Sequence, residues 1–171
     1  MILTGQAIAN AIENGDIEIE SFEPDQLNPN SYNYRLGPEV IEVASTHPYR
    51  LGDAIKIPDA GLVLHPHRLY LAATAEIIGS RRYVTTLLGR SSVGRLGLFL
   101  NVSADLGHAG SRSRWTLELT VVQPLRVYGG MVVGQVAFWG QEGRLTPYCG
   151  RYHEDIEPQG SRDRRLQGIM P

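Results

Sequence analysis

The segment GRSSVGRLGL at residues 89–98 carries the residue types that bind phosphate. Arg90, Ser91 and Ser92 offer a guanidinium fork, two hydroxyls and backbone N–H groups beside a glycine, which together match the oxygens of a phosphate. Arg95 adds a second cation. The GxxxxGK(S/T) spacing of a Walker A loop is absent, so the residue types alone still favour a solvated surface loop over a phosphate site.

Glu118 is the only acidic residue between positions 106 and 141. It lies in WTLELTVV (115–122), where strand alternation places it on the opposite face from Leu117 and Leu119. A strand-borne carboxylate in a partly desolvated pocket takes and returns a proton when its pKa is lifted towards neutrality. The strand alone favours an ordinary solvent-facing residue at this position. Trp115 is expected to pack or to line a pocket wall.

Composition excludes several classes of protein. The 171 residues suit one domain, and the formal net charge of -2 provides no basic field for polymeric nucleic acid or an anionic membrane. A single cysteine, Cys149, excludes an internal disulfide and the His/Cys/Cys zinc cage of many nucleobase deaminases. The first residues lack a basic region before an apolar one, and no apolar run spans a bilayer, so we expect a cytoplasmic protein.

Turn residues divide the chain into strand-length pieces, as 19 glycines and 10 prolines suggest. Residues 5–14 predict one helix, capped by Thr4 and ended by Gly15. Gly134 predicts a bulge or a close approach. The polar tail fits a disordered terminus and an arm that folds over the protein equally well. Strands are expected at 17–22, 32–44, 47–53, 61–66, 68–78, 83–88, 97–104, 115–122, 125–128 and 132–139.

Five motifs resemble the dCTP deaminases in order and near their spacing. They are LNPNSYNYRLG (27–37), LHPHRLYLAATAEII (64–78), GRSSVGRLGLFLNVSA (89–104), TLEL (116–119) and GGMVVGQVAF (129–138). The resemblance covers roughly residues 1–159 and is most specific in GRSSVGRLGL and in Glu118, which follows Ala104 by fourteen residues. It implies a mainly β, distorted barrel or jelly-roll-like fold of the trimeric dUTPase type, with a short N-terminal helix.

The resemblance also implies an assembly and a division of the chain. Residues 1–147 would form the β domain, and residues 148–171 an arm over the active site. Three chains would form a homotrimer with active sites shared between subunits. Mg²⁺ would accompany the phosphates of a pyrimidine nucleotide, and no zinc would take part.

The resemblance implies site residues as well. Glu118 matches the general acid/base, with Ser91 and Arg95 supporting the water and the developing charge. Tyr148 and Gln159 match tail residues that close over the nucleotide. The substrate-binding set as a whole is Arg90, Ser92, Asn101, Ala104, His108, Thr116, Leu117, Gln135, Tyr148 and Gln159. An ion pair of Arg95 with Asp105 or Glu76 is the competing interpretation of that arginine.

The sequence departs from the family pattern at several positions. GHAGSRS (107–113) stands where relatives carry Ile-Asp-Pro-Gly and an aromatic, so His108 replaces a carboxylate that meets the sugar. This replacement argues against dUTP hydrolysis and leaves ribose and deoxyribose both open. His108 has no second ligand at metal spacing, so a loop residue is favoured over a metal ligand.

Three further departures concern charge. Asp155 replaces a lysine near the terminal phosphates, so either Arg151 or Arg162 substitutes for it or the substrate carries fewer phosphates. Asn101 stands in place of a histidine and Asn33 in place of an aspartate, which keeps hydrogen bonding but loses a titratable group.

We therefore expect a zinc-independent hydrolytic deaminase that converts a cytosine nucleotide to the uracil nucleotide and ammonia. The substrate could be dCTP, CTP or a monophosphate such as CMP or dCMP. Two alternatives stay open: a dUTPase-like nucleotide pyrophosphohydrolase and a non-catalytic nucleotide-binding trimer.

Overall fold

The computed structural model describes residues 1–43, 51–101, 104–150, 152 and 156–162. Its helical elements are α1 (Gly5–Glu13), the 3-10 helix η1 (Pro24–Gln26) and α2 (Ser91–Gly94). The strands are β1 (Ile17–Ile19), β2 (Leu27–Asn28), β3 (Ser31–Val43), β4 (Leu51–Lys56), β5 (Leu62–Leu64), β6 (Tyr70–Thr74), β7 (Ile78–Ser80), β8 (Val84–Gly89), β9 (Leu98–Leu100), β10 (Leu106–Gly107), β11 (Arg112–Ser113), β12 (Thr116–Val121), β13 (Leu125–Val127) and β14 (Val132–Trp139).

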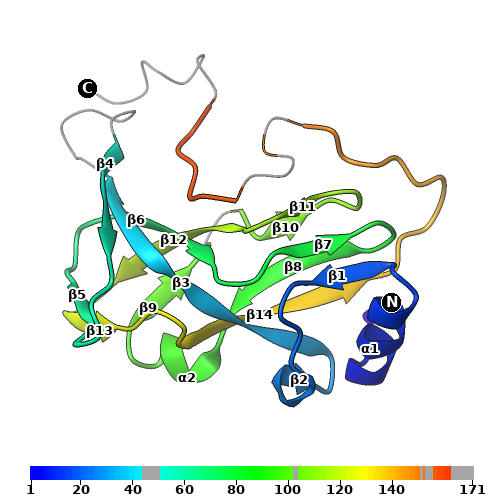
Figure 1. Ribbon diagram of the computed structural model, residues 1–171, viewed down its shortest axis with the longest axis horizontal. Coiled ribbons are helices and arrows are strands. Elements are labelled where there is room, and N and C mark those ends of the chain that lie inside the picture. The colour runs from blue at the N-terminus through cyan, green and yellow to red at the C-terminus, as the bar shows by residue number, and fades with distance from the viewer. Residues whose placement is uncertain (44–50, 102–103, 151, 153–155, 163–171) are drawn as a thin grey trace.

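One large curled sheet forms the body of the molecule (Figure 1). Its nine strands follow the order β10-β8-β14-β3-β6-β12-β9, with β2 and β4 paired to β3, and every pairing is antiparallel. A three-stranded sheet, β1-β7-β11, and a two-stranded sheet, β13-β5, complete the framework. The expected mainly β, barrel-like fold with one short N-terminal helix is confirmed.

The predicted helix is confirmed together with its cap. Thr4 Oγ1 accepts a hydrogen bond from the Ala7 amide, which satisfies one of the free N–H groups of the first turn. Gly15 follows the helix with a φ of 75°, a conformation that ends helices and that glycine adopts without strain. Ile8 on the inner face is fully buried.

Strand β14 has the predicted bounds, and Gly134 within it has the predicted close approach. A Cβ at this position would lie 2.1 Å from the Tyr34 hydroxyl oxygen, so only glycine fits. The pairing of β14 with β3 shifts register between Val132 and Gly134. The bulge places Tyr34, fully buried, against the backbone of β8, where its hydroxyl donates to the Leu88 carbonyl at 3.2 Å.

Strand β12 alternates as expected, with Leu117, Leu119 and Val121 buried and Glu118 half-buried on the other face. It lies between β6 and β9, but β9 pairs only with its second half, from Leu119 to Val121. The first half of β12 therefore has an edge that β9 does not cover.

Several parts of the fold differ from the sequence expectations. The strand expected at 68–78 is divided into β6 and β7, which belong to different sheets, and the strand expected at 97–104 ends at Leu100. The GRSS segment, expected to be a loop, begins the four-residue helix α2. The short strands β2, β10 and β11 were not expected, and much of the strand expected at 47–53 lies outside the described residues.

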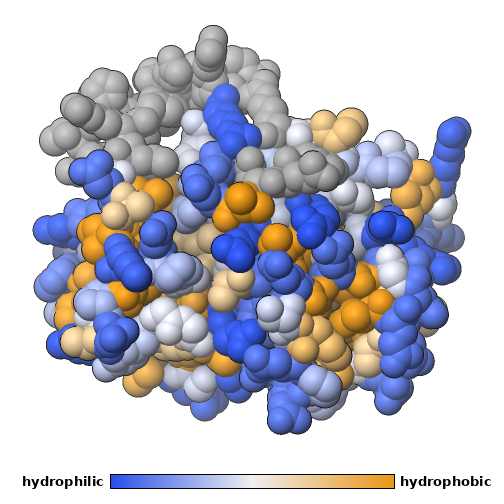
Figure 2. Space-filling view, viewed as in Figure 1, coloured by the Kyte–Doolittle hydropathy of each residue, from blue (hydrophilic) through white to orange (hydrophobic). Residues whose placement is uncertain are grey.

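Hydrophobic and hydrophilic residues are interspersed over the face of the molecule that Figure 2 shows. Among the described residues, no helix is long and apolar enough to cross a bilayer.

Candidate active site

A pocket of about 590 Å³ opens beside the uncovered half of β12. Its walls come from β12, from the segment 104–114 and from the C-terminal residues 148, 152 and 159–161. The described residues 156–162 lie above β12 in Figure 1. The lining residues are Val43, Leu69, Leu71, Asn101, Ala104, Leu106, Gly107, His108, Ser111, Ser113, Arg114, Trp115, Thr116, Glu118, Tyr148, Tyr152, Gln159, Gly160 and Ser161.

Glu118 supplies the acidic group of this pocket. Strand alternation turns its side chain away from the core, where Leu117 and Leu119 are fully buried. Within the described part of the chain, Glu118 is the only carboxylate that lines the pocket. A half-buried carboxylate next to an apolar wall has the surroundings that general acid/base chemistry requires.

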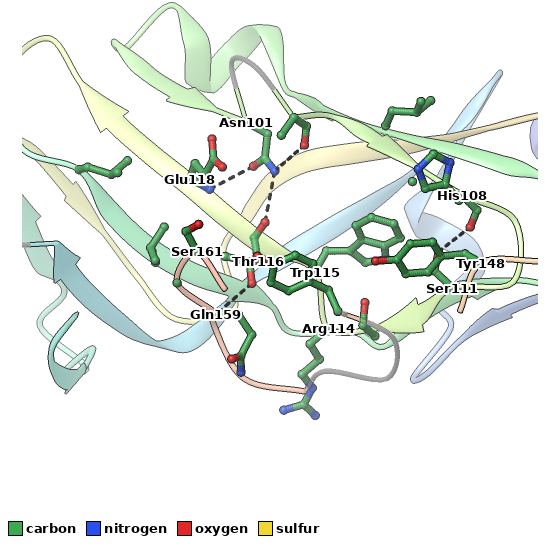
Figure 3. Close-up of a pocket in the computed structure, with 18 of the residues that line it drawn as sticks. Asn101, His108, Ser111, Arg114, Trp115, Thr116, Glu118, Tyr148, Gln159 and Ser161 are labelled. Carbon is green, nitrogen blue, oxygen red and sulfur yellow. Dashed lines mark hydrogen bonds between the residues drawn. The ribbon is translucent and has the colours of Figure 1, made fainter. Parts of the chain in front are cut away.

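Asn101 joins strand β12 to the segment at Ala104 through hydrogen bonds to three residues (Figure 3). Its backbone amide donates to the Glu118 carbonyl at 3.0 Å, and its side-chain oxygen accepts from the Glu118 amide at 3.2 Å. Its side-chain nitrogen donates to the Thr116 carbonyl at 3.2 Å and more weakly to the Ala104 carbonyl at 3.4 Å. Asn101 is 8% exposed, so these backbone groups occupy most of its hydrogen-bonding capacity.

His108 and Tyr148 form the opposite end of the pocket. Their rings stack with centroids 5.4 Å apart and an interplanar angle of 29°. Ser111 Oγ donates to the His108 carbonyl at 2.5 Å, which tightens the turn that carries His108. The stack joins a residue of the β domain to the first residue of the predicted arm, so both predicted substrate-binding residues face the same space.

The described part of the tail folds over the pocket as an arm. The Tyr148 amide donates to the Ala109 carbonyl at 2.8 Å, and the Gln159 amide donates to Thr116 Oγ1 at 3.0 Å. Arg162 donates to Gln159 Oε1 at 2.7 Å and stacks over the Tyr152 ring at 5.3 Å. These contacts hold the described tail residues against the turn at Ala109 and against β12, and the division of the chain into a β domain and an arm stays a prediction.

The other predicted residues lie outside this pocket. Arg90 caps α2, and Ser91, Ser92 and Arg95 are exposed on or next to that helix. In Figure 1, α2 lies at the lower edge of the sheet, whereas the arm crosses the upper edge. Within one chain, the predicted phosphate segment and Glu118 therefore do not share a pocket.

Two more predicted residues have other surroundings. The Leu117 side chain is fully buried in the core, so only its backbone could reach a ligand. Gln135 lies in β14, where its Oε1 accepts from Ser31 Oγ at 2.7 Å. The alternative ion pair of Arg95 with Glu76 is excluded, because Glu76 is 1% exposed and is paired with Arg35.

The sequence did not indicate several lining residues. Arg114 and Tyr152 carry no motif, and only the fold of the arm brings Tyr152 to the pocket. Trp115 was expected at a pocket wall and lies there, held by a hydrogen bond from Nε1 to the Ile78 carbonyl at 3.0 Å. Among the residues that the structure describes, no group of three or more His, Cys, Asp or Glu side chains is placed to hold a metal ion.

Comparisons with known proteins show similarity to one family. Residues 2–140 match the family model described as dCTP deaminase-like. The chain is 45% identical over 168 residues to a dCTP deaminase of Rhodopirellula baltica, covering 92% of this chain and 83% of that protein. It is 42% identical over 166 residues to a dUMP-forming dCTP deaminase of Hathewaya histolytica, covering 94% and 96%.

A solved structure is similar as well. The crystal structure of 2'-deoxycytidine 5'-triphosphate deaminase from Agrobacterium tumefaciens matches with a TM-score of 0.65 and 25% identity. The match covers 80% of this chain and 47% of that chain, so this protein spans about half the length of that relative.

Proposed function

Because the chain belongs to the dCTP deaminase-like family, we propose that it hydrolyses the exocyclic C–N bond of a cytosine nucleotide and releases the uracil nucleotide and ammonia. The observation that carries this proposal is the position of Glu118. Its carboxylate lies in a pocket that backbone carbonyl groups, aromatic rings and the arm enclose.

The reaction requires one group that moves protons. Glu118 takes a proton from water as the water oxygen bonds to C4 of cytosine, and it delivers this proton to N3. The C4–N4 bond then breaks, and the second proton of the water leaves with ammonia, again by way of Glu118. The Thr116 backbone and the arm hold the base in place, which supplies the orientation on which such proton transfers depend.

The phosphate segment is proposed to come from a neighbouring subunit of a homotrimer. Arg90, Ser91, Ser92 and Arg95 would then complete the pocket of the next chain, with Ser91 and Arg95 beside the attacking water. Exposed apolar residues next to α2 support a subunit contact, because a contact would cover them. These residues are Leu96, Phe99 and Val122, which are 54%, 45% and 67% exposed.

Mg²⁺ is proposed to enter with the phosphates of the substrate, where it neutralises their charge, and zinc is proposed to take no part. Phosphate oxygens are good ligands for Mg²⁺, and the metal then needs few protein ligands. Of the two arginines proposed to substitute for the family lysine, Arg162 is described, and Gln159 and Tyr152 contact it. Asp155 and Arg151 lie outside the described residues. The expected cytoplasmic location stays a prediction.

Several relatives in the comparisons bear on a second candidate function. Proteins of Hathewaya histolytica and Leptospira biflexa are named dUMP-forming, so release of pyrophosphate after deamination is the alternative. The single carboxylate among the described lining residues and His108 in place of an acid favour deamination alone.

A nucleotide panel separates these functions. The purified protein with Mg²⁺ is incubated with CMP, dCMP, CTP, dCTP or dUTP, and ammonia, pyrophosphate and uracil nucleotides are measured by chromatography. We expect ammonia and an uncleaved uracil nucleotide from at least one cytosine nucleotide, and the preferred substrate identifies the sugar and the phosphate number. Pyrophosphate from dUTP would favour the second candidate. If no product formed from any nucleotide, the result would favour a non-catalytic nucleotide-binding protein.

A further inference from the structure

The edge of β12 next to Glu118 is completed by a side chain instead of a strand. Strand β9 pairs with β12 up to Leu100, which faces Leu119. At Asn101 the chain leaves the sheet with a φ of 46°, in the left-handed region that asparagine tolerates better than most residues. Without another group, the Glu118 amide and the Thr116 carbonyl on this edge would lack partners.

The Asn101 amide takes the place of the missing strand. Its oxygen accepts from the Glu118 amide, and its nitrogen donates to the Thr116 carbonyl, as a backbone peptide of a neighbouring strand would. The second hydrogen of the nitrogen is directed to the Ala104 carbonyl, which joins the segment after β9 to the same edge. Figure 3 shows Asn101 between Glu118 and Thr116.

We propose that Asn101 is a positioning residue, which fixes the backbone of the proton-transferring Glu118 and the carbonyl of Thr116 in one arrangement. This inference rests on the proposed function. It differs from the substrate-binding role expected from the sequence, because the amide is directed at the protein backbone. A misplacement of about 1 Å at a reacting group costs on the order of a hundredfold in rate, so the loss of this clamp affects turnover more than binding.

Asn101→Gly is the first test variant. Glycine adopts a φ of 46° without strain, so the substitution removes the amide and leaves the backbone turn possible. We expect kcat for the preferred cytosine nucleotide to fall by about a hundredfold and KM to change by less than about threefold. A raised KM with unchanged kcat would overturn the inference and return Asn101 to the substrate-binding group.

Asn101→Asp tests the donated hydrogen bonds through pH. A neutral carboxyl group can donate to the Thr116 carbonyl and accept from the Glu118 amide, whereas a carboxylate repels both the carbonyl groups and Glu118. We expect the ratio of variant to wild-type kcat to rise as pH falls, by up to about tenfold per pH unit. The other described titratable groups that line the pocket are Glu118, His108, Arg114, Tyr148 and Tyr152. Taking the ratio cancels the titration of those that lie apart from the substitution, whereas Glu118 lies next to the new carboxylate and contributes to the change in the ratio.

Asn28→Asp is the matched control. Asn28 also donates two hydrogen bonds, to Ser31 Oγ at 3.1 Å and to Asn33 Oδ1 at 2.9 Å, but it does not line the pocket. Its activity ratio should not vary with pH over the range in which the variant is folded. If wild type turns over and the kcat ratio for Asn101→Asp does not change with pH, the inference about Asn101 is overturned and the proposed function stands. A wild type without turnover would overturn both.

Discussion

The backbone amide of Gln159 donates a hydrogen bond to Thr116 Oγ1 at 3.0 Å, so the arm is attached to the strand that carries Glu118. The two residues are 43 positions apart in sequence. The position of the described tail residues and the geometry of β12 are therefore linked through one hydroxyl group.

Thr116→Val removes this hydroxyl and keeps the shape of the side chain. Loss of one hydrogen bond costs about 1 kcal/mol, so we expect the arm to open more often and KM to rise by about fivefold to tenfold. Limited proteolysis of the arm provides an independent measurement, because an open arm is cleaved faster. Unchanged KM together with unchanged cleavage would contradict a role of this contact in closure.

Arg95→Ala and Glu118→Gln are predicted to complement each other. Each variant alone should be nearly inactive if the site takes Glu118 from one chain and Arg95 from its neighbour. Mixed trimers from equal amounts should regain about a quarter of wild-type activity. Each site needs Glu118 from one chain and Arg95 from the next, and each of these residues is present at about half of the sites. Coexpression of the two variants followed by an ammonia assay measures this value, and no recovery would contradict the shared site.

Glu76 is predicted to be the most sensitive charged residue of the fold. It accepts hydrogen bonds from the Arg35 backbone at 2.9 Å and from Arg35 Nε at 2.7 Å, while bonds to Glu23 and then to Glu76 raise the pKa of Arg35. Glu76→Gln removes the buried one of the two carboxylates paired with Arg35 and leaves Glu23 as its remaining charge partner, which should lower the free energy of unfolding by about 2 kcal/mol.

Urea unfolding measures this loss, with Glu42→Gln as the control. Glu42 pairs with Arg68 on the surface, where the side chains are 36% and 51% exposed. Its substitution should cost less than about 1 kcal/mol. If the free energy of unfolding fell equally in the two variants, burial would not explain the contribution of the Glu76 ion pair to stability.

The hydrogen bond from Arg112 lowers the pKa of Glu18, against the opposing effect of partial burial. A lowered folded-state pKa contributes stability above the unfolded-state value, and this contribution is lost as pH falls through the folded-state pKa. Glu18→Gln should therefore be slightly less stable than wild type near neutral pH and converge with it in acid. Both groups are exposed, so the gap should stay below about 1 kcal/mol, and urea unfolding at several pH values measures it.

The sequence predicted best what depends on local pattern. The alternation of β12 identified the outward face of Glu118, and the bounds of β14 follow from its apolar run. The four-residue helix α2 was not predicted, because one helical turn has no periodicity to detect. The two-residue strands β10 and β11 depend on their partners β8 and β7, which no local pattern reveals.

The pocket was predictable only in part. Family motifs identified Glu118, His108 and Thr116, but Tyr152 joins them only because the arm crosses β12. The hydrogen bonds of Asn101 depend on the point at which β9 leaves the sheet, which is a property of the tertiary fold. The family resemblance therefore indicated a substrate contact at Asn101, where the structure shows contacts to backbone.

The most direct test of Glu118 compares the wild type with Glu118→Gln on dCTP, in buffer that contains Mg²⁺ and a zinc chelator. The wild type should release one ammonia for each uracil nucleotide formed. The variant, which cannot exchange protons, should still bind dCTP but release ammonia at least about a hundredfold more slowly. Unchanged ammonia release by the variant would contradict the role of Glu118 as the proton-transferring residue.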